Sequence, residues 1–327
     1  MNKKLIALAV AGIMAAPMAA QAAPKLYGHL QAEITDLDKD GSTNDILQID
    51  DNKRGRLGVK GSEDLGGGLK AIYQMEFQVE TTTADIDDGD RNAFVGLKGG
   101  FGTIRIGANK QAYKYFGGVK YDPFVATYLQ ARGNGGMIKS ETGIASSHGQ
   151  NGFLKNSIMY TNKFGGATFW ATYQLSETNP DYNDLNMGVK FKIGKSAEVF
   201  VAHADDDAAT AASRGTNTKV GGQWKAGPHK ISAQYEMGDS DAAGGSGDND
   251  TIFLGYQFKM GKTVLVAQVG EVDFDLASAN DKEYMAVGVI HNFSKKTRIF
   301  AGYRTTDVDN GATSDVDALT VGLRILF

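Results

Sequence analysis

The feature that most constrains this chain is an alternation of apolar and polar residues with a period of two. It runs for about 9 to 12 residues at a time, most clearly in segments 25–34, 69–80, 167–176 and 318–327. A period of two indicates a β-strand with one apolar face. Strands of soluble domains average about 5 to 6 residues. Tilted strands of about 9 to 11 residues cross a bilayer, where only a closed barrel satisfies every backbone group. The pattern therefore favours a transmembrane β-barrel over a soluble sandwich or propeller, which has shorter strands and more proline-rich turns.

The connections between these runs are of two kinds, short and long. The short ones are mostly rich in glycine, which supplies the positive φ of tight hairpins: 61–68, 98–102, 163–166, 193–196, 225–229, 260–262 and 293–296. The long ones are polar: 35–52, 81–90, 111–152, 177–183, 205–215, 238–249, 271–282 and 306–316. Fifteen connections join sixteen strands, and an even number leaves both chain ends on the periplasmic side. We therefore expect an all-β fold, a 16-stranded antiparallel transmembrane β-barrel with short periplasmic turns and long outer loops. A barrel of that size encloses an aqueous channel.

The N-terminal segment, residues 1–22, reads as a secretory signal peptide. It has Lys3 and Lys4, an apolar run over 5–14, and the small-residue site Ala20-Gln21-Ala22. The alternative, a short membrane anchor, is disfavoured because the apolar run is too short to span comfortably. Residues 23–327 then form the barrel. The absence of cysteine excludes a disulfide scaffold, and a signal peptide before a cysteine-free chain is typical of a bacterial envelope protein.

Motifs for catalysis, metals and nucleic acid are weak. The five histidines form no i,i+4 pair, and neither G-x-S-x-G nor H-E-x-x-H occurs. Segment 36–41 resembles half of a calcium loop, but its twelfth position is Leu47 rather than glutamate. Without the two lysines of the signal peptide the chain has 32 basic and 38 acidic residues, a net charge of −6, which disfavours nucleic acid. We expect no enzyme activity, cofactor or metal site.

Several segments resemble the trimeric general-diffusion porins of Gram-negative bacteria: 26–28, 56–76, 91–107, 156–166 and 321–327. The resemblance follows the order of the mature chain and implies a homotrimer in the bacterial outer membrane, in contact with outer-membrane lipid and lipopolysaccharide. It implies passive diffusion of small hydrophilic solutes. It also implies that the third outer loop, about 111–152, folds into the barrel and narrows it opposite a ladder of basic residues. Finally, it implies that the barrel-assembly machinery reads the terminal aromatic residue, here Phe327.

The charges at such a constriction decide which ions pass. On the wall we expect these to be Arg54, Arg56, Lys60, Arg91 and Arg105, and on the loop Lys114, Lys120, Asp122, Arg132, Lys139 and Glu141. Strict alternation turns Arg91 outward unless its strand begins after it. Cation-preferring members of the family have an acid-rich constriction loop, whereas this loop carries four basic residues and two acids. We therefore predict mild anion selectivity. The alternative is a barely selective pore whose loop lysines point into water.

The other outer loops are rich in aspartate, for example in segments 36–51 and 85–90. Such clusters form either a solvated rim or a surface that divalent cations bridge to anionic lipopolysaccharide. Two further functions stay open at this point: a substrate-specific channel or adhesin, and an envelope enzyme.

Overall fold

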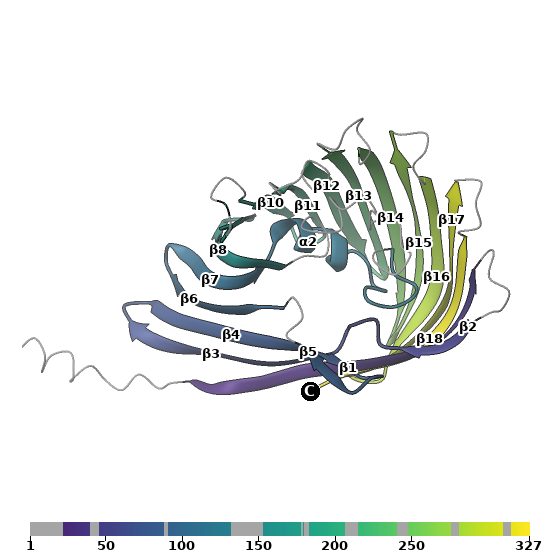
Figure 1. Cartoon of the computed structure of the whole chain (residues 1–327), viewed down its shortest axis with the longest axis horizontal. Coiled ribbons are helices and arrows are strands. Elements are labelled where there is room, and N and C mark those ends of the chain that lie inside the picture. The colour runs from purple at the N-terminus through teal and green to yellow at the C-terminus, as the bar shows by residue number, and fades with distance from the viewer. Residues whose placement is uncertain are drawn as a thin grey trace, which may run out of the picture.

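The computed structural model describes residues 22–39, 46–87, 91–131, 153–177, 179, 183–206, 215–240, 248–275, 281–309 and 315–327. The strands form one antiparallel sheet (Figure 1): β1 (Ala22–Lys39), β2 (Ile46–Asp50), β3 (Arg56–Gly66), β4 (Leu69–Glu80), β5 (Asp85–Asp87), β6 (Ala93–Gly99), β7 (Gly102–Lys110), β8 (Phe153–Phe164), β9 (Ala167–Gln174), β10 (Leu185–Ile193), β11 (Ala197–Asp206), β12 (Gly215–Ala226), β13 (His229–Ser240), β14 (Asn249–Met260), β15 (Thr263–Phe274), β16 (Asp281–Asn292), β17 (Thr297–Asp309) and β18 (Val316–Leu326). The predicted signal peptide lies, apart from Ala22, outside the described residues, and β1 already begins at that residue.

The sheet closes into a barrel of sixteen strand positions, which confirms the predicted fold class. The outer half of β1 pairs with β2 and its periplasmic half with β3, so β2 and β3 are two pieces of one barrel strand. They are separated by segment 51–55, in which Asn52 and Lys53 have positive φ. In the same way β5 and β6 both pair with β4. Pairing of β1 with β18 closes the cylinder.

Alternation along each strand separates an apolar outer face from a mixed inner face. On β14, Ile252 and Leu254 are 52% and 45% exposed, whereas their neighbours Thr251 and Phe253 are 2% and 1% exposed. The outward residues form the apolar band that a barrel presents to lipid. Among the described residues, no helix is long and apolar enough to cross a membrane.

Several strands extend further than the sequence predicted. β1 runs through Asp36 and Asp38 to Lys39, and β2 already begins at Ile46, although 35–52 was expected to be a loop. β11 and β17 likewise extend through Asp206 and Asp309. The reason is that the hydrogen-bonded ladder continues above the apolar band, where both faces of a strand meet water. Hydrophobic alternation therefore stops before the strand does.

The third outer loop lies inside the barrel, as predicted (Figure 1). Its described part, 111–131, contains the short helix α2 (Ala112–Tyr115) and the 3-10 turn η1 (Gly118–Lys120). Tyr113, Phe116 and Tyr121 pack against inward residues of β8, β9, β11 and β14–β16. Phe124 and Leu129 pack against β15–β17. The barrel thus has a one-sided core between the loop and the wall.

Candidate functional site

Hydrogen bonds fix the first half of the inner loop to the wall. The Tyr113 backbone N donates to Asn186 Oδ1 of β10 at 3.0 Å, and the Tyr113 hydroxyl donates to Glu236 Oε2 of β13 at 2.8 Å. The Gly118 backbone N donates to Gln234 Oε1 at 2.7 Å. Helix α2 is too short to be stable alone, so these contacts and the aromatic packing hold it in place.

Asp122 has a different place from the one predicted. It is only 2% exposed and accepts hydrogen bonds from the backbone N of Phe124 at 2.8 Å, the backbone N of Ala131 at 3.1 Å and Gln268 Nε2 at 3.0 Å. The sequence placed Asp122 among the charges of the lumen. In the structure it holds the loop together and fastens it to β15, because loop backbone donors buried here need an acceptor.

The far end of the described loop reaches the opposite side of the barrel. Gln31 Nε2 of β1 donates to the Ala126 carbonyl at 2.5 Å, and Arg324 Nη2 of β18 donates to the Val125 carbonyl at 3.2 Å. The Tyr128 hydroxyl donates to Asp50 Oδ2 of β2 at 2.9 Å. The loop therefore crosses the interior and is anchored on two sides.

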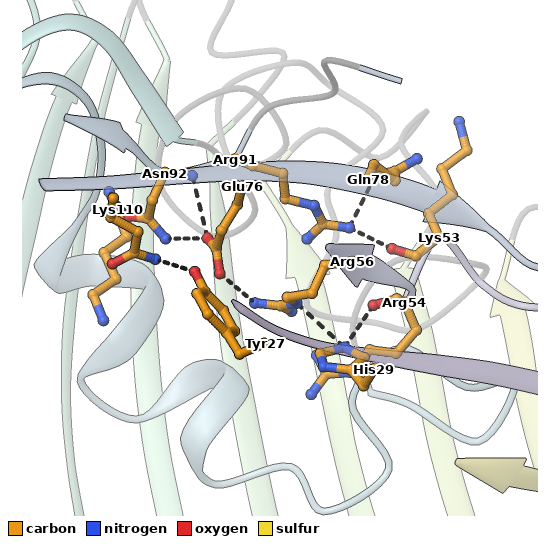
Figure 2. Close-up of polar contacts among 11 residues, drawn as sticks. Tyr27, His29, Lys53, Arg54, Arg56, Glu76, Gln78, Arg91, Asn92 and Lys110 are labelled. Carbon is orange, nitrogen blue, oxygen red and sulfur yellow. Dashed lines mark hydrogen bonds and ion pairs between the residues drawn. The ribbon is translucent and has the colours of Figure 1, made fainter. Parts of the chain in front are cut away.

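Across the interior from α2, the wall carries a group of arginines (Figure 2). Arg91 Nη2 donates to Gln78 Oε1 at 2.9 Å and to the Lys53 carbonyl at 2.6 Å. Arg56 Nε lies 3.2 Å from His29 Nε2, which is 2.7 Å from the Arg54 carbonyl. Strand β6 begins at Ala93, after Arg91, so strict alternation does not apply to Arg91. The structure thus brings together Arg54, Arg56 and Arg91.

Glu76 is the acidic member of this group. Its Oε1 lies 3.7 Å from Arg56 Nη1, and its Oε2 accepts from Asn92 Nδ2 at 2.6 Å. It offsets part of the charge of Arg56, and the three arginines outnumber this one carboxylate. The wall group remains net positive.

Lys110, at the end of β7, and Lys120 of the loop lie around an aromatic pair formed by Tyr115 of α2 and Trp170 of β9. The Tyr115 and Trp170 rings are stacked, with centroids 6.1 Å apart. Lys110 Nζ lies 4.7 Å and Lys120 Nζ 5.4 Å from the Tyr115 ring centroid, within cation–π range. Although Lys120 remains exposed to the lumen, partial burial of its ammonium group, followed by repulsion from Arg54, Lys190 and Arg56, lowers its pKa. Lys120 and the wall arginines thus place positive charge on both sides of the opening.

The other predicted site residues are spread along the barrel. Arg105 stacks on the Phe94 ring at 4.2 Å, and Lys114 lies 4.3 Å from the Phe153 ring. Lys60 is exposed and lies 4.5 Å from the Tyr27 ring, toward the periplasmic turns. Arg132, Lys139 and Glu141 lie outside the described residues.

Several basic residues of the interior were not predicted, among them Lys110, Arg298 and Arg324. Arg298 and Arg324 are directly opposite each other on β17 and β18, and Arg324 Nε donates to Gln31 Oε1 at 2.6 Å. In the segment 318–327, Arg324 alternates with outward Leu323 and Ile325, so its inward direction was readable from the sequence. Its position beside the wall arginines depends on the closure of the barrel.

Phe327 lies at the seam between the first and last strands. Its backbone N donates to the Gly28 carbonyl at 3.0 Å, and the Gly28 backbone N donates back to the Phe327 carbonyl at 3.2 Å. The Phe327 ring covers Gly28 so closely that a Cβ there would lie 2.4 Å from a ring carbon. Its side chain is about half exposed.

Comparisons with known proteins agree with this architecture. A family model described as Gram-negative porin matches residues 7–311. Outer membrane porin protein 32 of Delftia acidovorans is 27% identical over 99% of this chain and 93% of its own length. Major outer membrane protein P.IB of Neisseria meningitidis serogroup B is 36% identical over 36% of this chain and 37% of that protein.

Solved structures show the same fold. The anion-selective porin from Comamonas acidovorans superposes with a TM-score of 0.77 at 20% identity, covering 93% of this chain and 99% of that one. OmpT of Vibrio cholerae in its trimer form gives a TM-score of 0.70 at 18% identity, covering 93% and 99%. The family match extends over nearly the whole barrel, and the chain therefore belongs to the Gram-negative porin family.

Proposed function

We propose that the protein is an outer-membrane channel for the passive diffusion of small hydrophilic solutes, with a mild preference for anions. The observation that carries the preference is the placement of Lys120 on the loop opposite Arg54, Arg56 and Arg91 on the wall, with Lys110 of β7 beside them. Glu76 provides limited compensation, and Asp122 is engaged inside the loop. An anion entering this section meets positive charge on both sides, which favours it over a cation.

The relatives support the same direction. One structural neighbour is described as an anion-selective porin, and another occurs in a trimer form. We propose that this chain likewise forms a homotrimer. We also propose that Phe327 is read by the barrel-assembly machinery and that the acidic outer rim faces lipopolysaccharide. We propose that the protein acts as a channel rather than as an enzyme, in keeping with its membership of the Gram-negative porin family.

Reversal potentials in a KCl gradient across a planar bilayer test the preference. The wild-type channel should favour chloride, and the double variant Arg54→Gln/Arg56→Gln should lower the anion-to-cation permeability ratio by about twofold or more, since selectivity follows the charges of the narrowest section. The matched control is Lys295→Gln/Lys296→Gln, which removes two charges from an exposed turn and should leave the ratio near the wild-type value. A cation-preferring wild-type channel would overturn the proposal.

Swelling of liposomes in neutral sugars of increasing size tests general diffusion. We expect a graded decline of rate with sugar size. Saturation by one solute would instead identify a substrate-specific channel.

A further inference from the structure

A repeated lysine marks the periplasmic end of the barrel interior. The strands β6, β8, β10, β12 and β14 all run down to short turns, and in each of them the second-last residue is lysine: Lys98, Lys163, Lys192, Lys225 and Lys259. We call these five residues the penultimate lysines. Their recurrence beside successive turns makes an arc of positive charge below the constriction.

The penultimate lysines face the lumen. On β8, Lys163 shares its parity with the buried Met159, while Ile158 and Phe164 of the other parity are exposed to lipid. On β14, Lys259 shares its parity with the buried Phe253, while Met260 is exposed. The same alternation holds on β6, β10 and β12. A lysine on this face of the strand is placed to act on solutes in the channel mouth.

The strand register places lysines directly opposite one another on this inner face. The like-charged cross-strand pairs are Lys25 with Lys60, Lys70 with Lys98, and Lys225 with Lys230. Like charges directly opposite each other in a sheet are destabilising. Three such pairs on the inner face toward the periplasmic end are therefore not explained by the stability of the barrel, and they point to an anionic occupant.

Carboxylates neutralise little of this charge. Lys70 Nζ lies 3.5 Å from Asp64, but both side chains are about half exposed, and exposed ion pairs are weak. Lys190 pairs with Glu198 at 3.6 Å. Lys98 has no ion-pair partner among the described residues.

A cavity coincides with the pair Lys70 and Lys98. Its volume is about 340 Å³, and its lining residues are Ser62, Gly68, Lys70, Ile72, Lys98 and Gly99. It combines two ammonium groups, a hydroxyl and glycine backbone, and it has room for a small oxyanion with bound water. Ammonium groups on flexible stems bind phosphate-like oxygens as point charges.

We propose that this cavity, together with the penultimate lysines, is a second anion site at the periplasmic mouth that binds small multivalent oxyanions. It is separate from the arginine and lysine group of the constriction. This second site rests on the proposed anion-conducting function, and it adds a class of anion and the end of the channel at which that anion binds.

Block of chloride current by inorganic tripolyphosphate tests the site. The chain has no cysteine, so Ser196→Cys in the turn between β10 and β11, labelled with a bulky impermeant maleimide, identifies which chamber faces the turns. Tripolyphosphate added to that chamber should block at a concentration about tenfold lower than from the other chamber, because attraction to several fixed charges adds up.

The double variant Lys70→Gln/Lys98→Gln separates the site from the constriction. It should raise the blocking concentration from the periplasmic chamber about fivefold or more and leave block from the outer chamber unchanged. The variant also removes a like-charged pair, so it should fold at least as well as the wild type, which heat-modified migration on gels will verify. Lys295→Gln/Lys296→Gln is the control of equal charge and should block like the wild type.

Two results would overturn the second site: equal block by the wild type from both chambers, or unchanged periplasmic block in the Lys70→Gln/Lys98→Gln variant. Neither result bears on the ion preference that the reversal potential measures. A cation-preferring reversal potential would contradict the proposed anion preference alone, since block by tripolyphosphate is measured independently of it.

Discussion

The ion preference of the constriction depends on individual basic side chains that lie close to other basic side chains. Lys120 of the inner loop lies beside the Tyr115 ring, and Arg54 and Arg56 repel its ammonium group. Partial burial and these cations make its charged form less favourable than in free lysine. Among the site residues of the loop, Lys120 is therefore the one whose charge should respond to alkaline pH.

Lys120 should give the anion preference a dependence on alkaline pH. Its pKa lies below the ordinary value of 10.5, so it loses its proton at lower pH than a free lysine does. Anion preference should then weaken with rising pH. In Lys120→Arg, which keeps its charge, the preference should persist to higher pH. Reversal potentials measured from pH 7 to 10.5 check this, and identical profiles for the two proteins would contradict it.

Parity in the sequence predicted part of this residue-level arrangement. It pointed Arg56 and Arg105 inward because their neighbours are apolar, and it placed Lys120 on the right loop. It missed Arg324 as a member of the wall group, because Arg324 meets Gln31 only when the two ends of the chain pair. It also misjudged Asp122, whose partners include Gln268, far away in the sequence. Alternation predicts which face of the strand a residue occupies, whereas its hydrogen-bond partners depend on how the barrel closes.

At the scale of elements, the inner loop is held by tertiary contacts rather than by its own helix. Its apolar side chains pack on the wall of β8–β17, and its backbone is fixed by side chains of β1, β10, β13 and β18. The sequence identified the loop as the longest connection, but no local pattern predicts which strands the loop covers. Asp122 joins its two halves through the backbone N–H groups of Phe124 and Ala131.

Loss of the Asp122 carboxylate should loosen the loop. Asp122→Ala leaves buried donors without an acceptor, at a cost of about 1–3 kcal/mol for each. We expect larger and noisier single-channel conductance and closure at lower voltage. Asp122→Asn retains one acceptor oxygen and should have a smaller effect. Conductance traces for the two variants check this, and wild-type behaviour of Asp122→Ala would show that packing alone holds the loop.

At the scale of the whole molecule, the barrel closes along a seam between β1 and β18. Gly28 leaves room there for the Phe327 ring and for the Arg56 carbonyl, each 2.4 Å from where a Cβ would lie. The sixteen-strand count was predictable from alternation and from the two kinds of connection. A closed barrel requires the first and last strands to pair, but the sequence did not predict the contact between Gly28 and Phe327.

A methyl group at Gly28 should weaken closure. Gly28→Ala should destabilise the folded barrel by roughly 1–3 kcal/mol through overpacking, seen as a lower temperature of the heat-modified shift on gels. Gly100→Ala is the matched control, because a Cβ at Gly100 meets no atom within 4 Å. Equal transition temperatures for the two variants would contradict a close fit at the seam.

The seam also sets the timing of folding. His29 pairs with Leu326, so one edge of the first strand has its neighbour only after nearly the last residue has been synthesised. Until then the sheet has two open edges, and open edges pair readily with other chains. Contacts between residues so distant in sequence also form slowly. A cell that makes this protein must therefore keep the growing chain apart from its copies until synthesis is complete, and a chain that stops before β18 leaves one edge of its first strand unpaired.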